Sequence, residues 1–243
     1  MGGVTRAAAL SVLCAGALVQ AGEVIELYYF ERPPYVMRRP GSEDVVGLTA
    51  TPAAQAFKGA GIAFRWVQLP TVRQLVTLKD SPTPACAVGW FRNAERDQQF
   101  KFTKPIYRDR PTVALARADF TPPAATLAET LRHPGLAVLV KDGFSYGPLI
   151  DGMLAQIRPA RVVTSAETQA MARMVAAQRA HLMFAAEEEA TYLAEQTDGP
   201  AAGLKVVHFT DLPPGERRHI LCSKAVPDEV IERLNKAITV EVP

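Results

Sequence analysis

Short apolar runs alternate with amphipathic stretches along most of this chain. Runs rich in β-branched and aromatic residues predict three strands in the first part, at residues 24–30, 63–69 and 85–88. Thr51-Pro52 offers a cap and a first-turn proline for a helix that ends at Gly61, and a short helix is predicted over residues 71–78. Because a β-α-β-α-β order needs crossover helices, we expect these strands to be parallel.

The same alternation restarts after a breaker at residues 108–111. Strands are predicted at residues 112–116, 136–140, 161–163, 181–184 and 204–209, and residues 220–222 form a further extended run. Helices are predicted at residues 146–157, from a capping box at 164–167, from three glutamates at 187–189, and from Pro227 onward. The pattern therefore predicts an α/β protein with two similar halves.

The first residues resemble an export signal. Arg6 gives a short positive region, residues 7–19 are apolar and uncharged, and Val19-Gln20-Ala21 is typical of a cleavage site. The alternative is a buried N-terminal helix. We expect residues 1–21 to be a signal peptide and the protein to be periplasmic. Since no long apolar segment follows, we expect no membrane insertion of the remaining chain.

Composition narrows the function classes. Hydrophobic residues make up 48% of the chain and charged residues 21%, with a formal net charge of +2. This content is too apolar for a disordered chain, and the balanced charge gives no basic surface for nucleic acid. The four histidines are scattered and no CxxC motif is present, so we expect no metal or cofactor.

The segment around Arg96 contains the most specific motif. The apolar run at residues 85–88 leads into Gly89, Trp90 and Phe91, and Arg96 follows, ahead of Phe102-Thr103-Lys104-Pro105-Ile106-Tyr107. This arrangement resembles the family 3 extracellular solute-binding proteins, the periplasmic receptors of polar amino acid transporters. Ser223-Lys224-Ala225-Val226-Pro227-Asp228-Glu229 is similar to the segment where that family returns to its first lobe.

The resemblance implies a periplasmic binding protein-like type II fold, with two α/β lobes joined by two hinge crossings. Lobe one would comprise residues 22–109 and 215–243, and lobe two residues 110–214. The expected partner is a small, polar metabolite that carries a carboxylate and is amino-acid-like. An ABC transporter permease or a sensor would receive the loaded protein, which we expect to be a monomer without enzymatic activity.

Several residues are candidates for ligand contact. An arginine just past a strand end is well suited to hold a carboxylate through two parallel hydrogen bonds, which makes Arg96 the first candidate. The loop that contains Ser145 and Tyr146 precedes a helix, where free N–H groups bind anions. The resemblance adds an aromatic contact near Arg32 and Tyr35 and an acidic group near Glu187. The remaining candidates are Trp90 and Phe91, at least one of which should face the cleft.

Two other functions remain open at this stage. Gly143-Phe144-Ser145-Tyr146-Gly147 also matches the nucleophile elbow of a serine hydrolase, with Ser145 as nucleophile, Asp211 as acid and His208 or His219 as base. A solute-binding-like protein could instead serve as a partner-binding module.

The cysteines bear on the fold. Cys86 and Cys222 remain after removal of the signal, and the family's first lobe places their two strands side by side. The resemblance therefore implies a Cys86–Cys222 disulfide, the alternative being two buried thiols that only pack.

Overall fold

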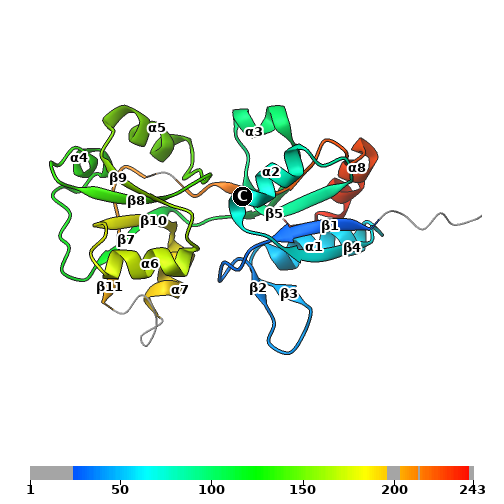
Figure 1. Ribbon diagram of the computed structural model, residues 1–243, viewed down its shortest axis with the longest axis horizontal. Helices are drawn as coiled ribbons and strands as arrows, with labels where there is room; N and C mark the ends of the chain where they lie inside the picture. The colour runs from blue at the N-terminus through cyan, green and yellow to red at the C-terminus, as the bar shows by residue number, and fades with distance from the viewer. Residues whose placement is uncertain (1–23, 196–202, 213, 241–243) are drawn as a thin grey trace, which may run out of the picture.

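The computed structural model describes residues 24–195, 203–212 and 214–240. The expected signal peptide at residues 1–21 lies outside the described residues. Two α/β lobes lie side by side and are joined by extended segments (Figure 1). Within the described part of the chain, no helix is long and apolar enough to span a membrane.

Lobe one is built on a five-stranded sheet. Its strand order is β4 (Phe64–Gln68), β1 (Ile25–Tyr29), β5 (Ala85–Phe91), β12 (Arg217–Cys222) and β6 (Lys101–Arg108). As the sequence predicts, β1 is parallel to both β4 and β5. The late strand β12 lies between β5 and β6 and is antiparallel to both. The helices of this lobe are α1 (Ala50–Gly59), α2 (Thr71–Lys79), α3 (Ala94–Gln99) and α8 (Asp228–Ala237), and a small hairpin is formed by β2 (Met37–Arg38) and β3 (Val45–Val46).

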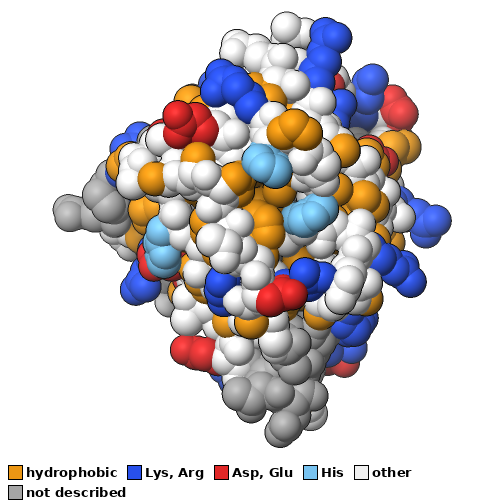
Figure 2. Space-filling view, turned by 90° about the vertical axis from the view of Figure 1, so that its left-hand side faces the viewer, with side chains coloured by type: hydrophobic (Ala, Val, Ile, Leu, Met, Phe, Trp, Pro, Cys, Tyr) orange, Lys and Arg blue, Asp and Glu red, His pale blue; other side chains and the backbone are white. Residues whose placement is uncertain are grey.

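Lobe two is built on a second five-stranded sheet. Its strand order is β11 (Leu204–Val207), β7 (Thr112–Arg117), β10 (Leu182–Ala186), β8 (Ala137–Lys141) and β9 (Ala160–Thr164). Strands β8, β9 and β10 are parallel, and β7 is antiparallel to β10 and β11. The helices are α4 (Leu127–Leu131), α5 (Pro148–Ile157), α6 (Thr168–Ala176) and α7 (Glu187–Ala194). On the end of the molecule formed by this lobe, charges of both signs are scattered among apolar side chains (Figure 2).

The two segments that join the lobes run close together. The amide of Asp109, just after β6, donates to the carbonyl of Glu216, just before β12, at 3.0 Å. A Cβ on Gly215 would lie 2.1 Å from the carbonyl oxygen of Asp109. Since no side chain fits in that space, Gly215 allows the two crossings to touch.

Three predicted helix starts differ from the structure, and the helix predicted from residue 146 begins at Pro148. The first helix begins at Ala50 with Thr49 as its N-cap, not at Thr51-Pro52. The Thr51 hydroxyl, the expected cap of the helix, accepts instead from the amide of Gly47. The capping box expected at residues 164–167 does not form, and α6 begins at Thr168. Glu167, which would complete the box, instead binds the Lys141 ammonium at 2.7 Å.

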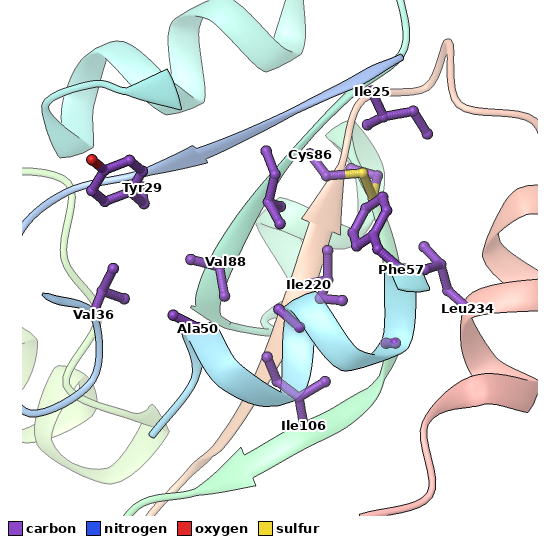
Figure 3. Packing of buried hydrophobic residues seen from close by; sticks show 14 of the residues in the cluster. Ile25, Tyr29, Val36, Ala50, Phe57, Cys86, Val88, Ile106, Ile220 and Leu234 are labelled. Carbon is purple, nitrogen blue, oxygen red and sulfur yellow. A yellow bond between two sulfur atoms is a disulfide. The ribbon is translucent and has the colours of Figure 1, made fainter. Parts of the chain in front are cut away.

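The Cys86–Cys222 disulfide expected from the resemblance is present. The two residues are paired across β5 and β12, with their Cα atoms 3.9 Å apart. Both are fully buried in the core of lobe one, next to Phe57 and Ile220 (Figure 3). The bridge therefore ties the returning strand to the sheet made by the first part of the chain.

We expect the chain beginning at Gly22 to show no free thiol when it is denatured without reductant. Replacing Cys86 and Cys222 by alanine should lower the free energy of unfolding by about 2–4 kcal/mol, because the bridge closes a long loop. Thiol titration and urea unfolding measure the two effects. Two free thiols per denatured chain would reject the bridge.

Candidate functional site

A cavity lies between the two lobes, at the carboxyl ends of several strands. Lobe one lines it with residues that follow β1, the end of β5, and the first turns of α2 and α3. Lobe two lines it with the end of β10 and the loop before α5. This is the position where open α/β sheets gather their ligands. Of the sequence candidates, the cavity is lined by Arg32, Trp90, Phe91, Arg96, Ser145 and Tyr146.

Arg96 is held in the cavity wall by the local fold. Asn93 caps α3 by accepting the amide of Arg96 at 2.9 Å, and this fixes the start of the short helix. The residue is 8% exposed. Its guanidinium donates to the carbonyl of Phe91 at 2.9 Å and, across the cleft, to the carbonyl of Gly143 at 3.0 Å. Arg96 therefore touches both lobes.

The charge on Arg96 has no direct counter-ion. Among the described residues, no salt bridge joins Arg96 to a carboxylate, and the charges of Asp151 and Glu95 act on it only from a greater distance. Burial lowers the pKa of its guanidinium, but an arginine side chain stays protonated in proteins. Two of its five N–H donors are used by the two carbonyls, so the others are available to a bound anion.

The ring of Trp90 packs against the guanidinium of Arg96. The Arg96 Cζ atom lies 4.8 Å from the centre of the Trp90 ring, which suits a cation–π contact. The indole N–H donates to Gln74 Oε1 at 3.2 Å, and Gln74 donates in turn to the carbonyl of Leu69 at 2.8 Å. Gln74 is fully buried, so it fixes the orientation of Trp90. Sequence reasoning missed Gln74, because no local pattern marks a glutamine on a helix as the partner of a later tryptophan.

Trp90 and Phe91 both line the cavity, although neighbours on a regular strand face opposite ways. Both residues end β5 at the cavity, just after an irregularity at Gly89, where the pairing of β5 with β12 skips one residue. Gly89 has a φ of +80°, and a Cβ there would lie 3.1 Å from the Thr49 hydroxyl. A β-bulge of this kind redirects the side chains that follow it.

The donors of the loop before α5, which the sequence predicts to be free for an anion, are partly used by the protein itself. Ser145 lines the cavity, but its hydroxyl donates to the carboxylate of Asp151, one turn into the helix. Asp151 also accepts the amide of Tyr146 at 2.9 Å. The expected anion site at this helix start is thus already occupied by an acidic side chain. The Tyr146 hydroxyl accepts the amide of Lys141 at 2.8 Å, and burial raises its pKa to about 12.

Arg32 joins the lobes through a buried ion pair. Its guanidinium donates through two nitrogens to the two carboxylate oxygens of Glu189, at 2.6 and 2.7 Å. The Glu189 side chain is 1% exposed. The Arg32 Cζ lies 5.1 Å from the ring centre of Tyr35 and 4.9 Å from that of Phe144. Arg32 therefore contacts lobe two directly in this conformation.

At the start of α7, Glu188 and Glu189 contact lobe one, whereas Glu187 is the acidic residue expected there from the resemblance. Glu187 contacts His208 at 3.1 Å and does not line the cavity. Glu188 accepts the hydroxyl of Tyr35 at 2.9 Å, which places Tyr35 behind the cavity wall and not in it. Glu189 holds Arg32. Because α7 begins at Glu187, its second and third residues, Glu188 and Glu189, contact the first lobe. This detail of helix phase does not follow from the resemblance.

A second buried ion pair closes the hinge side of the cavity. Arg218 donates to both carboxylate oxygens of Asp109, each at 2.6 Å, and also to the carbonyl of Gly89 at 2.9 Å. Its Cζ lies 4.1 Å from the ring centre of Tyr35 and 4.5 Å from that of Phe91. Both charged residues are buried, and sequence reasoning missed both.

The geometry does not assemble a hydrolase triad. In the described part of the chain, the hydroxyl of Ser145 is bonded to Asp151 and to the amide of Gly147, not to a histidine. Asp211 accepts the first amides of α4, at 2.7 and 3.0 Å. His219 contacts the carbonyl of Thr103 at 2.8 Å, and burial lowers its pKa. Among the described residues, no three metal-binding side chains gather into a cluster.

Comparison with solved structures identifies the architecture. An ancestral arginine-binding protein bound to arginine matches with a TM-score of 0.70 at 19% identity, covering 88% of this chain and 90% of that chain. The fold is that of the type II periplasmic binding proteins. The substrate-binding protein of an amino acid ABC transporter matches with a TM-score of 0.69 at 14% identity, over 89% of this chain and 92% of that one.

A sensor domain has the same fold. The sensor domain of a histidine kinase, described as similar to periplasmic binding proteins, matches with a TM-score of 0.69 at 18% identity, over 90% of each chain. No protein-family model and no curated protein matches the sequence. The neighbours are thus amino-acid-binding proteins and sensor domains, and what they share with this chain is the fold.

Proposed function

We propose that this protein is an exported solute-binding protein that closes its two lobes around a small, carboxylate-bearing metabolite. The observation that supports this most is Arg96, a buried cation in the wall of the cavity between the lobes, with no carboxylate partner among the described residues. A buried charge without a counter-ion favours binding of an anion, because the anion compensates the cost of desolvation.

The proposed working cycle follows from the contacts across the cleft. We take lobe one as residues 22–109 and 215–243 and lobe two as residues 110–214. A ligand that touches both lobes only when they are closed shifts the population toward the closed form. The closed form of a monomer would then be recognised by a transporter permease or by a sensor, two roles that occur among proteins of the same fold.

One observation favours a second function. The Arg32–Glu189 pair and the Tyr35–Glu188 hydrogen bond link the lobes through the protein's own side chains. A chain that closes without a solute could present its closed surface to a partner, as the partner-binding alternative requires. A screen for solute binding separates the two functions.

Trp90 provides a direct optical test of solute binding. The chain has two tryptophans, and Trp66 is partly buried and packs against Tyr29 and Phe64 at the edge of the core. In a Trp66→Phe variant, the emission reports on Trp90 in the cavity wall. We expect a saturable change of this emission on titration with one or more small carboxylates, accompanied by a rise in melting temperature.

The partner-binding and hydrolase alternatives predict different results for the same purified protein. If no carboxylate of a broad metabolite panel changes the Trp90 emission or the melting temperature, the solute-binding proposal fails and the partner-binding function is favoured. Hydrolysis of simple esters that is lost in Ser145→Ala would support the hydrolase.

A further inference from the structure

The charges around the cavity favour one class of carboxylate over another. This inference rests on the proposed function, since it concerns the ligand of the same site. Arg32, Arg96 and Arg218 line the cavity, and among the described residues Asp109 is the one acidic residue that lines it. An amino acid brings a carboxylate and an ammonium group, so the site needs an acceptor for a cation as well as donors for an anion.

The carboxylates near the cavity are already engaged with arginine. Asp109 uses both oxygens for Arg218, and Glu189 uses both oxygens for Arg32. Asp151, at the start of α5, accepts the Ser145 hydroxyl and the Tyr146 amide. An ammonium group would have to share one of these carboxylates with its present donors, close to three arginines. Arg96, in contrast, can bind an anion through its remaining N–H donors without breaking its hydrogen bonds to Phe91 and Gly143.

The first turn of α2 adds a polar group, the Thr71 hydroxyl, that has no hydrogen-bond partner among the described residues. Thr71, the first residue of this nine-residue helix, is 2% exposed and lines the cavity. Its hydroxyl is itself buried. Buried hydroxyls are normally satisfied, so an orphaned one beside a cavity points to a group that is bound there. The amides of the first helical turn lie at the same end of the helix and also favour an anion.

Much of the remaining cavity lining is aromatic, although Thr112 and Ser145 also contribute polar groups. The aromatic residues that line it are Phe30, Trp90, Phe91, Phe144, Tyr146 and Phe184. Phe30 of lobe one and Phe144 of lobe two face each other across the cleft with their ring centres 6.1 Å apart. The cavity volume is about 50 Å³ in this conformation. The aromatic side chains and the small volume suit a ligand whose body is compact and largely apolar.

We propose that the cleft binds a compact monocarboxylate that has an apolar body and no ammonium group, and that Arg96 and Thr71 contact its carboxylate. Thr71 is then a ligand-contacting residue in addition to those that the sequence indicates. Its hydroxyl donates to the ligand and becomes satisfied on binding.

Matched pairs of ligands test the ligand class. Calorimetry compares 3-methylbutanoate with valine, and 3-phenylpropanoate with phenylalanine, at the same pH and ionic strength. We expect at least one carboxylate to bind tenfold or more tightly than its amino acid. If each amino acid binds more tightly than its matched carboxylate, or less than tenfold more weakly, the proposed ligand class is wrong while the proposed function stands. If none of the four compounds binds, and no other carboxylate binds, the ligand class and the proposed solute-binding function are both overturned.

Substitution of Thr71 tests the contact. Thr71→Val keeps the shape of the side chain and removes the hydroxyl, whereas Thr71→Ser keeps the hydroxyl. With the tightest carboxylate of the panel, we expect Thr71→Val to weaken binding at least fivefold and Thr71→Ser to stay within about threefold of the original. Urea unfolding of the ligand-free Thr71→Val protein should show equal or greater stability, because an unsatisfied buried hydroxyl has been removed.

Two results would overturn the role of Thr71. The first is unchanged carboxylate affinity in Thr71→Val. The second is loss of stability in the ligand-free Thr71→Val protein, which would show that the hydroxyl serves the fold. Thr71→Ala provides a second hydroxyl-free variant, and its affinity should fall as that of Thr71→Val does.

Discussion

Replacing Arg218 by methionine is expected to lower the free energy of unfolding by about 3–5 kcal/mol, the cost of breaking a buried ion pair. The Asp109 side chain is 3% exposed, and both of its oxygens are bonded to Arg218. Without its partner, the carboxylate would stay buried and uncompensated next to the crossing between the lobes. Urea unfolding followed by circular dichroism measures the loss.

The neighbouring residue supplies a matched control. Arg217 precedes Arg218 on β12 and is exposed, so Arg217→Met should change stability little. A double variant with Asp109→Asn and Arg218→Met should recover part of the loss, because the buried carboxylate is removed together with its partner. Equal effects of the two single methionine substitutions would contradict the structural role of the pair.

The strand and helix order of lobe one could be predicted because it depends on local pattern. The β-branched and aromatic runs that form β1, β4 and β5 are short and well separated, and the crossover helices between them make parallel pairing the expected outcome. The Cys86–Cys222 bridge was reached by resemblance, because nothing local tells the last strand to insert between β5 and β6.

The site could be predicted only in part. Arg96 was found because it stands in a motif, and the structure places it in the cavity wall. The Asp109–Arg218 pair was missed because its members are 109 residues apart and meet only where the two crossings touch. Glu189 was missed because the choice among three successive glutamates depends on where α7 begins. Thr71 was predicted as the start of a helix, but its unpaired hydroxyl is visible only in three dimensions.

Replacing Arg96 by alanine is expected to weaken ligand binding by about 2–5 kcal/mol, because the carboxylate would be left buried without its charged donor. Arg96→Lys should recover little of this loss, since an ammonium group cannot reproduce the two parallel bonds of a guanidinium. Arg92 provides the matched control: it is exposed, pairs with Asp97 at 2.7 Å and does not line the cavity. Arg92→Ala should bind the ligand as the original protein does.

Calorimetry of these three variants with the tightest-binding carboxylate tests the central claim most directly. The account predicts a normal enthalpy change and affinity for Arg92→Ala, and little or no heat of binding for Arg96→Ala and Arg96→Lys in proteins that unfold at the original urea concentration. Unchanged affinity in a folded Arg96→Ala protein would contradict the assignment of the cavity as the carboxylate site.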